Sequence, residues 1–187
     1  MNDDLIAAID ILKKGGIILY PTDTIWGIGC DATNEEAISK IYRIKQRQDE
    51  KSLLILLDDA SRLYDYVAEV PDMAQNLIEI TEKPLTIIYP GAINLAPNLI
   101  ADDGSIGIRI VRDEFCRQLV RRFGKPVVST SANISGMPWP PFYHNIEKAI
   151  VKSVDYVVKW RQGDTRRGKP SGIVKLGIHG EVKVIRE

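Results

Sequence analysis

The feature that most restricts the fold of this chain is a short apolar run with no polar side. Residues 53–57 read LLILL, so a strand formed by them must be covered on both of its faces. A sheet with helices on each face, as in α/β proteins, provides that cover. Other strands are expected at residues 17–19, 85–89, 105–111, 126–129, 156–158, 171–176 and 182–186, the last two as a hairpin about Gly177 to Gly180. The chain therefore predicts an α/β fold.

Helical segments with one apolar face lie between these strands. They are expected at residues 3–14, 60–68, 72–81, 113–123 and 145–152, and one more helix follows a capping box formed by Thr33 and Glu36. Asp3 or Asp4 can cap the first helix. A chain of 187 residues suits a single domain spanning residues 1–187.

The composition excludes some classes of protein. Hydrophobic residues make up 44% of the chain, enough to bury a core, and no apolar run approaches the ~18 residues of a membrane span. Lys+Arg and Asp+Glu both number 25, so attraction of the whole molecule to nucleic acid is not indicated and any RNA contact needs a local basic face. Cys30 and Cys116 are expected to be reduced, packed thiols of a cytoplasmic protein.

Polar side chains crowd together where the first buried strand ends. Pro21 stops this strand because it has no N–H for a neighbouring strand, and residues 22–24 read Thr-Asp-Thr. Gly27 and Gly29 are expected to keep the following loop open. Because open α/β sheets bind ligands at strand ends, this segment is either a ligand site or a simple polar turn.

Two cations, Lys45 and Arg47, lie at the end of the helix that follows the capping box. Residues two apart on a helix are separated by about 200°, so both can face one site only if the helix unwinds there. Their alternative role is to stabilise the negative end of the helix dipole.

The strand at 105–111 alternates apolar and polar residues. Ser105, Gly107 and Arg109 share one face, which offers a hydroxyl, open backbone and a cation that can grip a carboxylate or phosphate at two points. The alternative is an edge strand with a solvated polar face.

A second polar segment follows the strand at 126–129. Ser131 and Asn133 point the same way in an extended chain, and with Gly136 they suit either a phosphate or sugar contact or a simple turn. The loop at 137–141 reads MPWPP and cannot be regular structure. Its Trp139 either contacts a partner or folds back on the core.

Standard catalytic signatures are absent from the sequence. His144 and His179 are isolated, so no metal site is expected, and the Walker A, GxGxxG and G-x-S-x-G patterns are missing. The remaining cations and hydroxyls at strand ends would act by positioning reactants and neutralising charge.

Four motifs in this order resemble a known family. PTDTIWGIG, KQR, GSIGIRI and STSANISG are similar to motifs of the YrdC family, and the resemblance runs from Leu5 to Arg186. It implies a twisted mixed β-sheet flanked by helices and enclosing a concave basic cavity. It also implies a reaction of L-threonine, bicarbonate and ATP that gives threonylcarbamoyl-adenylate and pyrophosphate.

The resemblance implies roles for individual residues and partners. The catalytic residues would be Lys45, Arg47, Ser131 and Asn133, threonine would bind Thr22 and Arg109, and the nucleotide would bind Lys45, Arg47, Ser105, Ser131, Asn133 and Ser171. ATP is then a substrate that brings Mg²⁺, and no permanent cofactor is expected. Transferase partner proteins would pass the threonylcarbamoyl group to the adenosine beside the anticodon of tRNA, with a tRNA or double-stranded RNA contact on this chain.

Four positions depart from the family pattern. Leu56 stands where a histidine contacts threonine, Gln48 replaces a proline, Gly172 replaces the threonine after Ser171, and Pro141 ends a loop that often reads Ser-Pro-Thr. Two alternatives to the synthase are a non-catalytic YrdC-like protein that binds RNA and an enzyme that forms another carbamoyl-adenylate with a different acceptor.

Overall fold

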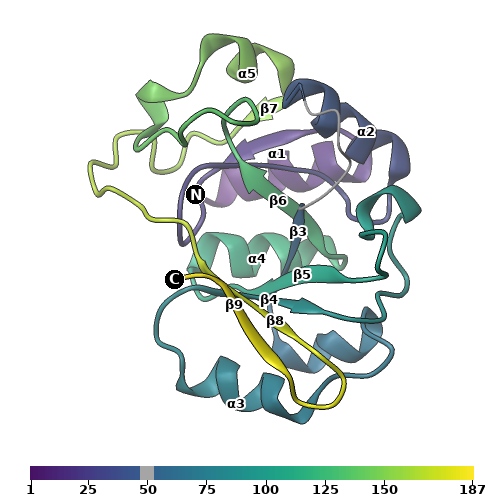
Figure 1. Ribbon diagram of the computed structural model, residues 1–187. Coiled ribbons are helices and arrows are strands. Elements are labelled where there is room, and N and C mark those ends of the chain that lie inside the picture. The colour runs from purple at the N-terminus through teal and green to yellow at the C-terminus, as the bar shows by residue number, and fades with distance from the viewer. Residues whose placement is uncertain (47–52) are drawn as a thin grey trace.

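The computed structural model describes residues 1–46 and 53–187, and the strands in these residues form one mixed sheet (Figure 1). Nine strands in the described residues lie in the order β7-β1-β2-β6-β3-β5-β4-β8-β9. Their bounds are β1 (Ile18–Tyr20), β2 (Gly27–Gly29), β3 (Leu54–Leu57), β4 (Leu85–Tyr89), β5 (Ile106–Ile110), β6 (Val127–Ser131), β7 (Tyr156–Val157), β8 (Gly172–Leu176) and β9 (Val182–Arg186). Three neighbouring pairs, β1–β7, β3–β5 and β4–β8, are parallel, and the other pairs are antiparallel. The predicted α/β fold with a mixed sheet is confirmed.

Helices cover both faces of this sheet. They are α1 (Asn2–Lys13), α2 (Glu35–Ile44), α3 (Asp72–Ile80), α4 (Glu114–Phe123) and α5 (Lys148–Ser153), with short 3₁₀ turns at Ala60–Asp65, Pro97–Leu99 and Tyr143–Asn145. Figure 1 shows α1 and α4 lying side by side behind the sheet, and the two helices contact each other. No helix in the described part of the chain is long and apolar enough to cross a membrane.

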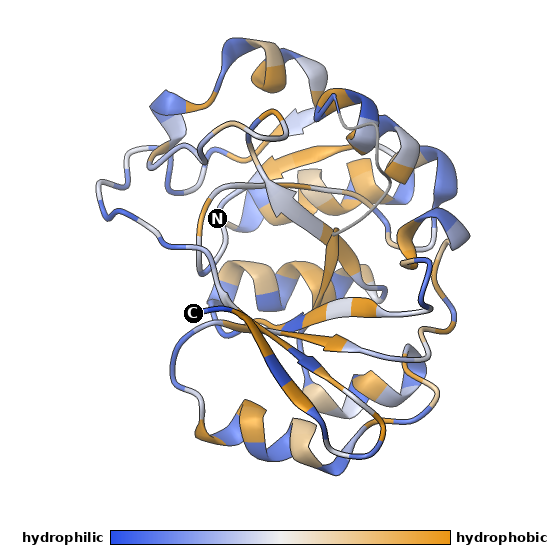
Figure 2. Ribbon diagram, viewed as in Figure 1, coloured by the Kyte–Doolittle hydropathy of each residue, from blue (hydrophilic) through white to orange (hydrophobic). Residues whose placement is uncertain are grey.

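Two apolar clusters fill the space between the sheet and its helices. One joins Leu56 of β3 to α1 and α4, where Leu5 and Phe115 are buried. The other contains Ile55, the preceding residue of β3, and Ile38 of α2. Neighbouring residues of β3 thus face opposite clusters, which confirms that this strand is covered on both sides. Figure 2 shows β1 and β3 as continuous apolar segments and α4 with an apolar side and a hydrophilic side.

The prediction of an open loop after residues 22–24 is wrong in part, because Gly27–Gly29 forms strand β2. This strand runs antiparallel between β1 and β6. A Cβ atom on Gly29 would lie 2.5 Å from the Val128 carbonyl oxygen and 2.7 Å from Cε1 of Tyr20. Glycine therefore permits close strand packing here.

The predicted capping box is also wrong. Asn34 caps α2, because its side chain accepts a hydrogen bond from the Ala37 N–H. The Thr33 hydroxyl instead donates to Asp31 Oδ1 at 2.7 Å. Asp31 competes for the threonine, so the helix begins beyond it.

The predicted caps of the first helix are wrong too, since α1 has no side-chain cap and Asp4 lies inside it. Asp4 Oδ1 accepts hydrogen bonds from the Tyr156 hydroxyl at 2.7 Å and from the Lys159 N–H at 2.9 Å, and Oδ2 accepts one from the Trp160 N–H at 3.1 Å. Because the Asp4 carboxylate accepts hydrogen bonds from residues 156–160, it is not available to cap its own helix.

The observed bounds of the other helices differ less from the predicted ones. Residues 60–65 form a 3₁₀ turn where a longer helix is predicted, because Asp59 caps a single tight segment. The helix predicted at 145–152 splits into a 3₁₀ turn at Tyr143–Asn145 and helix α5. Helix α4 agrees with the predicted range 113–123 to within one residue and ends at Gly124 as predicted, and Asp113 is its N-cap.

The two cysteines are buried free thiols, as expected. Burial raises the pKa of both Cys30 and Cys116, and nearby Asp31 and Asp113 raise it further. Neither thiol is therefore activated as a nucleophile.

We predict that Asp4→Asn lowers the free energy of unfolding by about 1.5–3 kcal/mol at pH 7, the range for hydrogen bonds to a charged group. Burial alone would raise the Asp4 pKa, but its three hydrogen bonds outweigh burial and lower it. A depressed native pKa gives stability that is present above the unfolded pKa of about 3.9 and is lost as pH falls through the native pKa. Urea unfolding of both proteins should thus differ at pH 7 and converge in acid.

Asp3→Asn is the matched control, because Asp3 is exposed in the same helical turn. Equal urea midpoints for wild type and Asp4→Asn at pH 7 would contradict the anchoring role of Asp4.

Candidate functional site

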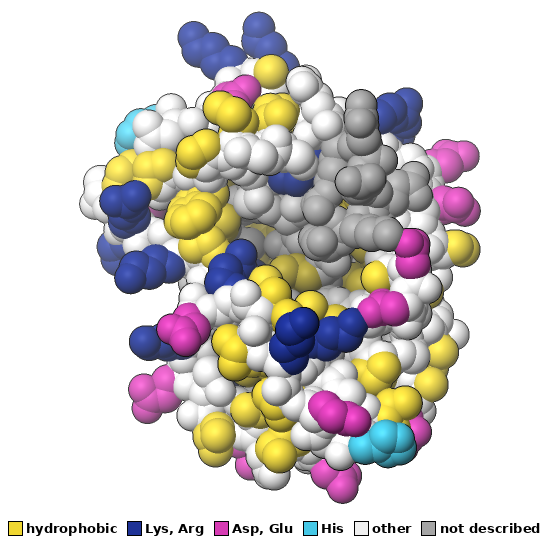
Figure 3. Space-filling view, viewed as in Figure 1, with side chains coloured by type: hydrophobic (Ala, Val, Ile, Leu, Met, Phe, Trp, Pro, Cys, Tyr) yellow, Lys and Arg dark blue, Asp and Glu magenta, His cyan; other side chains and the backbone are white. Residues whose placement is uncertain are grey.

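A cavity of about 230 Å³ lies where the polar ends of several strands meet. Its walls come from the turn after β1, from β2, β5 and β6, and from the β8–β9 hairpin. The predicted site residues that line it together are Thr22, Arg109, Ser131, Asn133 and Ser171. Figure 3 shows this face of the molecule hollowed near its middle, with Lys and Arg side chains around the hollow.

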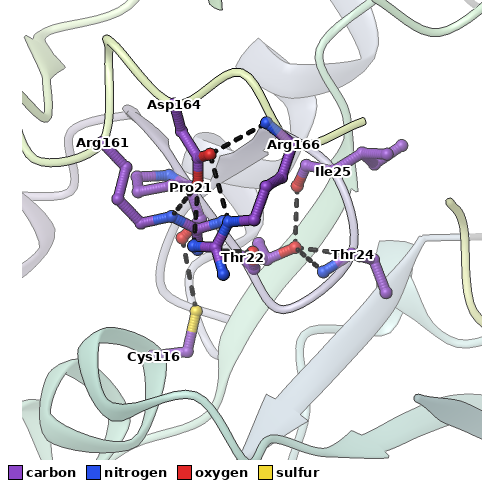
Figure 4. Close-up of polar contacts among 8 residues, drawn as sticks. All are labelled: Pro21, Thr22, Thr24, Ile25, Cys116, Arg161, Asp164 and Arg166. Atoms are coloured by element: carbon purple, nitrogen blue, oxygen red, sulfur yellow. Dashed lines mark hydrogen bonds and ion pairs between the residues drawn. The ribbon is translucent and has the colours of Figure 1, made fainter. Parts of the chain in front are cut away.

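The turn after β1 holds its own hydroxyls in a fixed arrangement (Figure 4). The Thr22 hydroxyl donates to the Ile25 carbonyl oxygen at 2.7 Å and accepts from the Thr24 N–H at 3.1 Å. The Thr22 and Thr24 hydroxyl oxygens are 2.8 Å apart. Since Thr22 has already used its one proton, Thr24 donates in this contact. Thr24 therefore keeps a free lone pair for a ligand, whereas Thr22 must release a bond before it can contact one.

Arg109 forms a buried ion pair with the same turn. Its Nη2 atom lies 3.1 Å from Oδ1 of Asp23, and the two side chains are only 4% and 10% exposed. Burial raises the Asp23 pKa, while the Arg109 guanidinium opposes the rise. The Nε–H of Arg109 has no hydrogen-bond partner among the described residues. A buried unpaired donor of this kind suits a ligand carboxylate or phosphate.

The strand predicted to carry Arg109 is not an edge strand. β5 pairs with β3 on one side and β4 on the other, and Ser105 and Arg109 are buried, so the alternative of an edge strand with a solvated polar face is wrong.

Lys45 lies behind the cavity wall. Helix α2 ends at Ile44, Lys45 is its C-cap, and Gln46 has a φ of +50°, so the chain leaves the helix where unwinding is expected. The Lys45 ammonium donates to the carbonyl oxygens of Ser131 at 2.7 Å and Asn133 at 2.9 Å. It thereby joins the end of α2 to the polar segment after β6. Arg47 and Gln48 lie outside the described residues.

The amide of Asn133 is held as well, because its Nδ2 donates to the Met137 carbonyl oxygen. Trp139, in the same loop, lines the cavity and is 43% exposed. It thus stands at the mouth and does not fold back into the core.

The β8–β9 hairpin adds a cation that the sequence reasoning missed. Arg186 lines the cavity, and its Nε donates to the Ser171 carbonyl oxygen at 2.9 Å. Burial, then the nearby Arg109 charge, lower the Arg186 pKa. The predicted hairpin could have revealed it, because Arg186 pairs with Ile173, two residues after Ser171.

Ser105 lies apart from the other predicted site residues, in an adjoining cavity of about 420 Å³. Leu54 and Ile173 line both cavities, so the two are neighbours. The Ser105 hydroxyl donates to Asp103 Oδ1 at 2.6 Å. Hydrogen bonds from Lys175 and Ser105 lower the Asp103 pKa to about 2.

Three departures from the family pattern fall on described residues. Leu56 is fully buried against the helices α1 and α4, in register with Arg109 on the neighbouring strand. Pro141 lines a small pocket behind the turn after β1, together with Thr22. Gly172 begins β8.

Within residues 1–46 and 53–187, no group of three His, Cys, Asp or Glu side chains is arranged to hold a metal ion. His144 and His179 are both exposed, as expected.

Comparison with known proteins places these features in context. The model of the family described as "Telomere recombination", which groups Sua5, YciO and YrdC, matches residues 10–187. The threonylcarbamoyl-AMP synthase of Pseudoalteromonas translucida is 37% identical over 71% of this chain and 72% of its own length. That of Vibrio parahaemolyticus is 31% identical over 91% of this chain and 93% of its own.

The solved structures that resemble this chain include members of the same family. E. coli YciO matches with a TM-score of 0.85 and 26% identity, over 100% of this chain and 90% of that one. P. abyssi Sua5 matches with a TM-score of 0.83 and 26% identity over 92% of this chain, which spans only 50% of the Sua5 chain.

We predict that Lys45→Met loosens the segment after β6. Methionine keeps the length of the side chain but cannot donate to the two carbonyl oxygens, so the free energy of unfolding should fall by about 1.5–3 kcal/mol. Hydrogen exchange of the amides at 131–137 should become faster. Lys40→Met, on the exposed side of the same helix, serves as the control. Unchanged exchange at 131–137 in Lys45→Met would show that the ammonium does not hold this segment.

Proposed function

The chain belongs to the Sua5/YciO/YrdC family, and from this we propose that it is a threonylcarbamoyl-AMP synthase. The observation that carries the proposal is the gathering of Arg109, the 22–24 turn and the segment 131–133 around one cavity. The substrates are L-threonine, bicarbonate and ATP, and the products are threonylcarbamoyl-adenylate and pyrophosphate. The enzyme is therefore a nucleotidyltransferase.

Threonine binds at the end of the cavity formed by β5 and the turn after β1. Its carboxylate lies against Arg109, whose Nε–H lacks a partner among the described residues. Its ammonium donates to Thr24, the hydroxyl with a free lone pair, and Thr22 fixes Thr24 in place. P. abyssi Sua5 has been solved in complex with L-threonine, and that structure shares this fold.

ATP spans the two adjoining cavities. Ser131, Asn133 and Ser171 contact it in the first, and Ser105 contacts it in the second. Arg109 and Arg186 make the first cavity basic, and Lys45 adds positive charge behind its wall. The family resemblance assigns Arg47 to the ATP phosphates. Mg²⁺ enters on the ATP phosphates as part of the substrate.

The reaction needs positioning and charge neutralisation from the protein. The threonine ammonium first loses a proton to solvent, and the resulting amine attacks the carbon of bicarbonate. The bond from that carbon to the bicarbonate hydroxyl breaks, the hydroxyl leaves as water with a second proton from the nitrogen, and a carbamate remains. A carbamate oxygen then attacks the α-phosphorus of ATP, the bond from that phosphorus to the bridging oxygen breaks, and pyrophosphate leaves. Arg109 holds the amino acid, and we assign to Arg47 the stabilisation of the charge that gathers on the departing pyrophosphate. Mg²⁺ carried by the ATP would neutralise part of the same charge.

The product is an activated group, so a transferase must accept it. We assign that step to partner proteins that modify the adenosine beside the anticodon of tRNA, in the cytoplasm. The alternative, a YrdC-like protein that binds RNA without catalysis, predicts salt-sensitive RNA affinity and no threonine-dependent use of ATP.

We predict pyrophosphate release from ATP only when threonine and bicarbonate are both present. Lys45→Ala and Arg47→Ala should abolish it. Arg109→Lys should raise the KM for threonine at least about tenfold, because lysine cannot make a two-point contact with a carboxylate. Release should be measured with each substrate withheld in turn.

Arg117→Ala is a suitable control, since Arg117 is exposed on α4. Retained activity in both Lys45→Ala and Arg47→Ala would refute the site assignment, and turnover that ignores threonine would refute the reaction.

A further inference from the structure

The segment between β7 and β8 packs against the turn that follows β1, at residues that do not line the main cavity. We name residues 159–170 the strap (yellow-green between β7 and β8 in Figure 1). Its start is fixed by Asp4, which accepts hydrogen bonds from the Lys159 and Trp160 N–H groups. Its end runs into Ser171, which lines the cavity. The strap is therefore held at both ends while its middle lies against the site.

The backbone of the strap touches the turn directly at Gly168. A Cβ atom at this position would lie 1.8 Å from the Thr24 carbonyl oxygen, so only glycine permits the contact. The 22–24 turn is thus fixed by backbone packing against Gly168 as well as by its own hydrogen bonds.

Arg161 makes the polar contact between the strap and the turn. Its Nη1 atom donates to the Thr22 carbonyl oxygen at 3.0 Å, and its Nε donates to Asp164 Oδ2 at 3.0 Å (Figure 4). Asp164 in turn accepts hydrogen bonds from the backbone N–H and the guanidinium of Arg166. The hydrogen bond and ion pair with Arg166 lower the Asp164 pKa, so this carboxylate stays charged near neutral pH.

The backbone of Arg161 is in an unfavourable conformation. Its φ is +65°, in the left-handed region that side chains other than glycine seldom adopt. A residue is kept in such a conformation when the surrounding structure requires it, and the conformation often marks a functional site. At this position the conformation accompanies a guanidinium that reaches both Thr22 and Asp164.

From these contacts we infer that Arg161 is a positioning residue for the amino-acid end of the cavity. It holds the Thr22 carbonyl, which fixes the hydroxyl of Thr22 and through it the hydroxyl of Thr24. Asp164 orients Arg161, and Gly168 closes the same turn. This inference rests on the proposed function, because the ligand that the turn positions is threonine. Arg161 itself does not line the main cavity, so its effect on the ligand is indirect.

The test uses Arg161→Gly. Glycine favours a φ of +65°, so relief of the backbone strain offsets part of the stability lost with the guanidinium contacts. We expect the KM for threonine to rise about tenfold, the cost of weakening the hydrogen bond between the threonine ammonium and Thr24, with the KM for ATP unchanged. Isothermal titration of threonine should show the same loss without turnover. Arg167→Ala is the matched control, because Arg167 is an exposed arginine of the same strap.

Asp164→Asn supplies a second, independent measurement. It should raise the KM for threonine in the wild-type background and have no further effect in Arg161→Gly, because Asp164 acts through Arg161. An unchanged threonine KM in Arg161→Gly, or parallel losses for threonine and ATP, would overturn the inference while the proposed function stands. Absence of threonine-dependent pyrophosphate release from the wild type and Arg167→Ala would overturn the proposed function, and this inference with it.

Discussion

The Arg109 guanidinium is buried in the middle of the sheet, 3.1 Å from the carboxylate of Asp23. A buried charge without a partner is costly, and removing one partner of such a pair typically costs about 3–5 kcal/mol. The turn after β1 supplies that partner, so the pair fixes this turn against β5. The hydroxyls beside Asp23 then face the cavity that Arg109 lines. Folding stability and the geometry of the site therefore depend on the same ion pair.

The rest of the site is built around this pair by groups that are themselves held. Lys45 ties the end of α2 to Ser131 and Asn133, and Arg186 ties β9 to Ser171. The strap holds the turn from behind through Arg161. Such prior organisation suits a reaction in which the protein contributes position and charge.

Much of the fold could be read from local patterns. The apolar run at 53–57 specified a strand covered on both faces, and Pro21 and Gly124 marked element ends correctly. The errors arose where a side chain had a distant partner. Asp4 accepts hydrogen bonds from residues 156–160, and Thr33 donates one to Asp31, so neither residue caps a helix. Gly29 is predicted to lie in a loop because the residue that requires a glycine there, Val128 on the neighbouring strand, is about a hundred residues away in the sequence.

The candidate site divides in the same way. Motifs and strand alternation are local, so the fold class and five residues of the site were predictable from them: Thr22, Arg109, Ser131, Asn133 and Ser171. The path of the chain in space was needed to show that these five residues line one cavity and that Ser105 lies in the next one. It also brought Arg186 to the cavity wall and Arg161 to the Thr22 carbonyl oxygen. Ion pairs and hydrogen bonds between distant segments form only when folding brings those segments together, and no local sequence pattern records that approach.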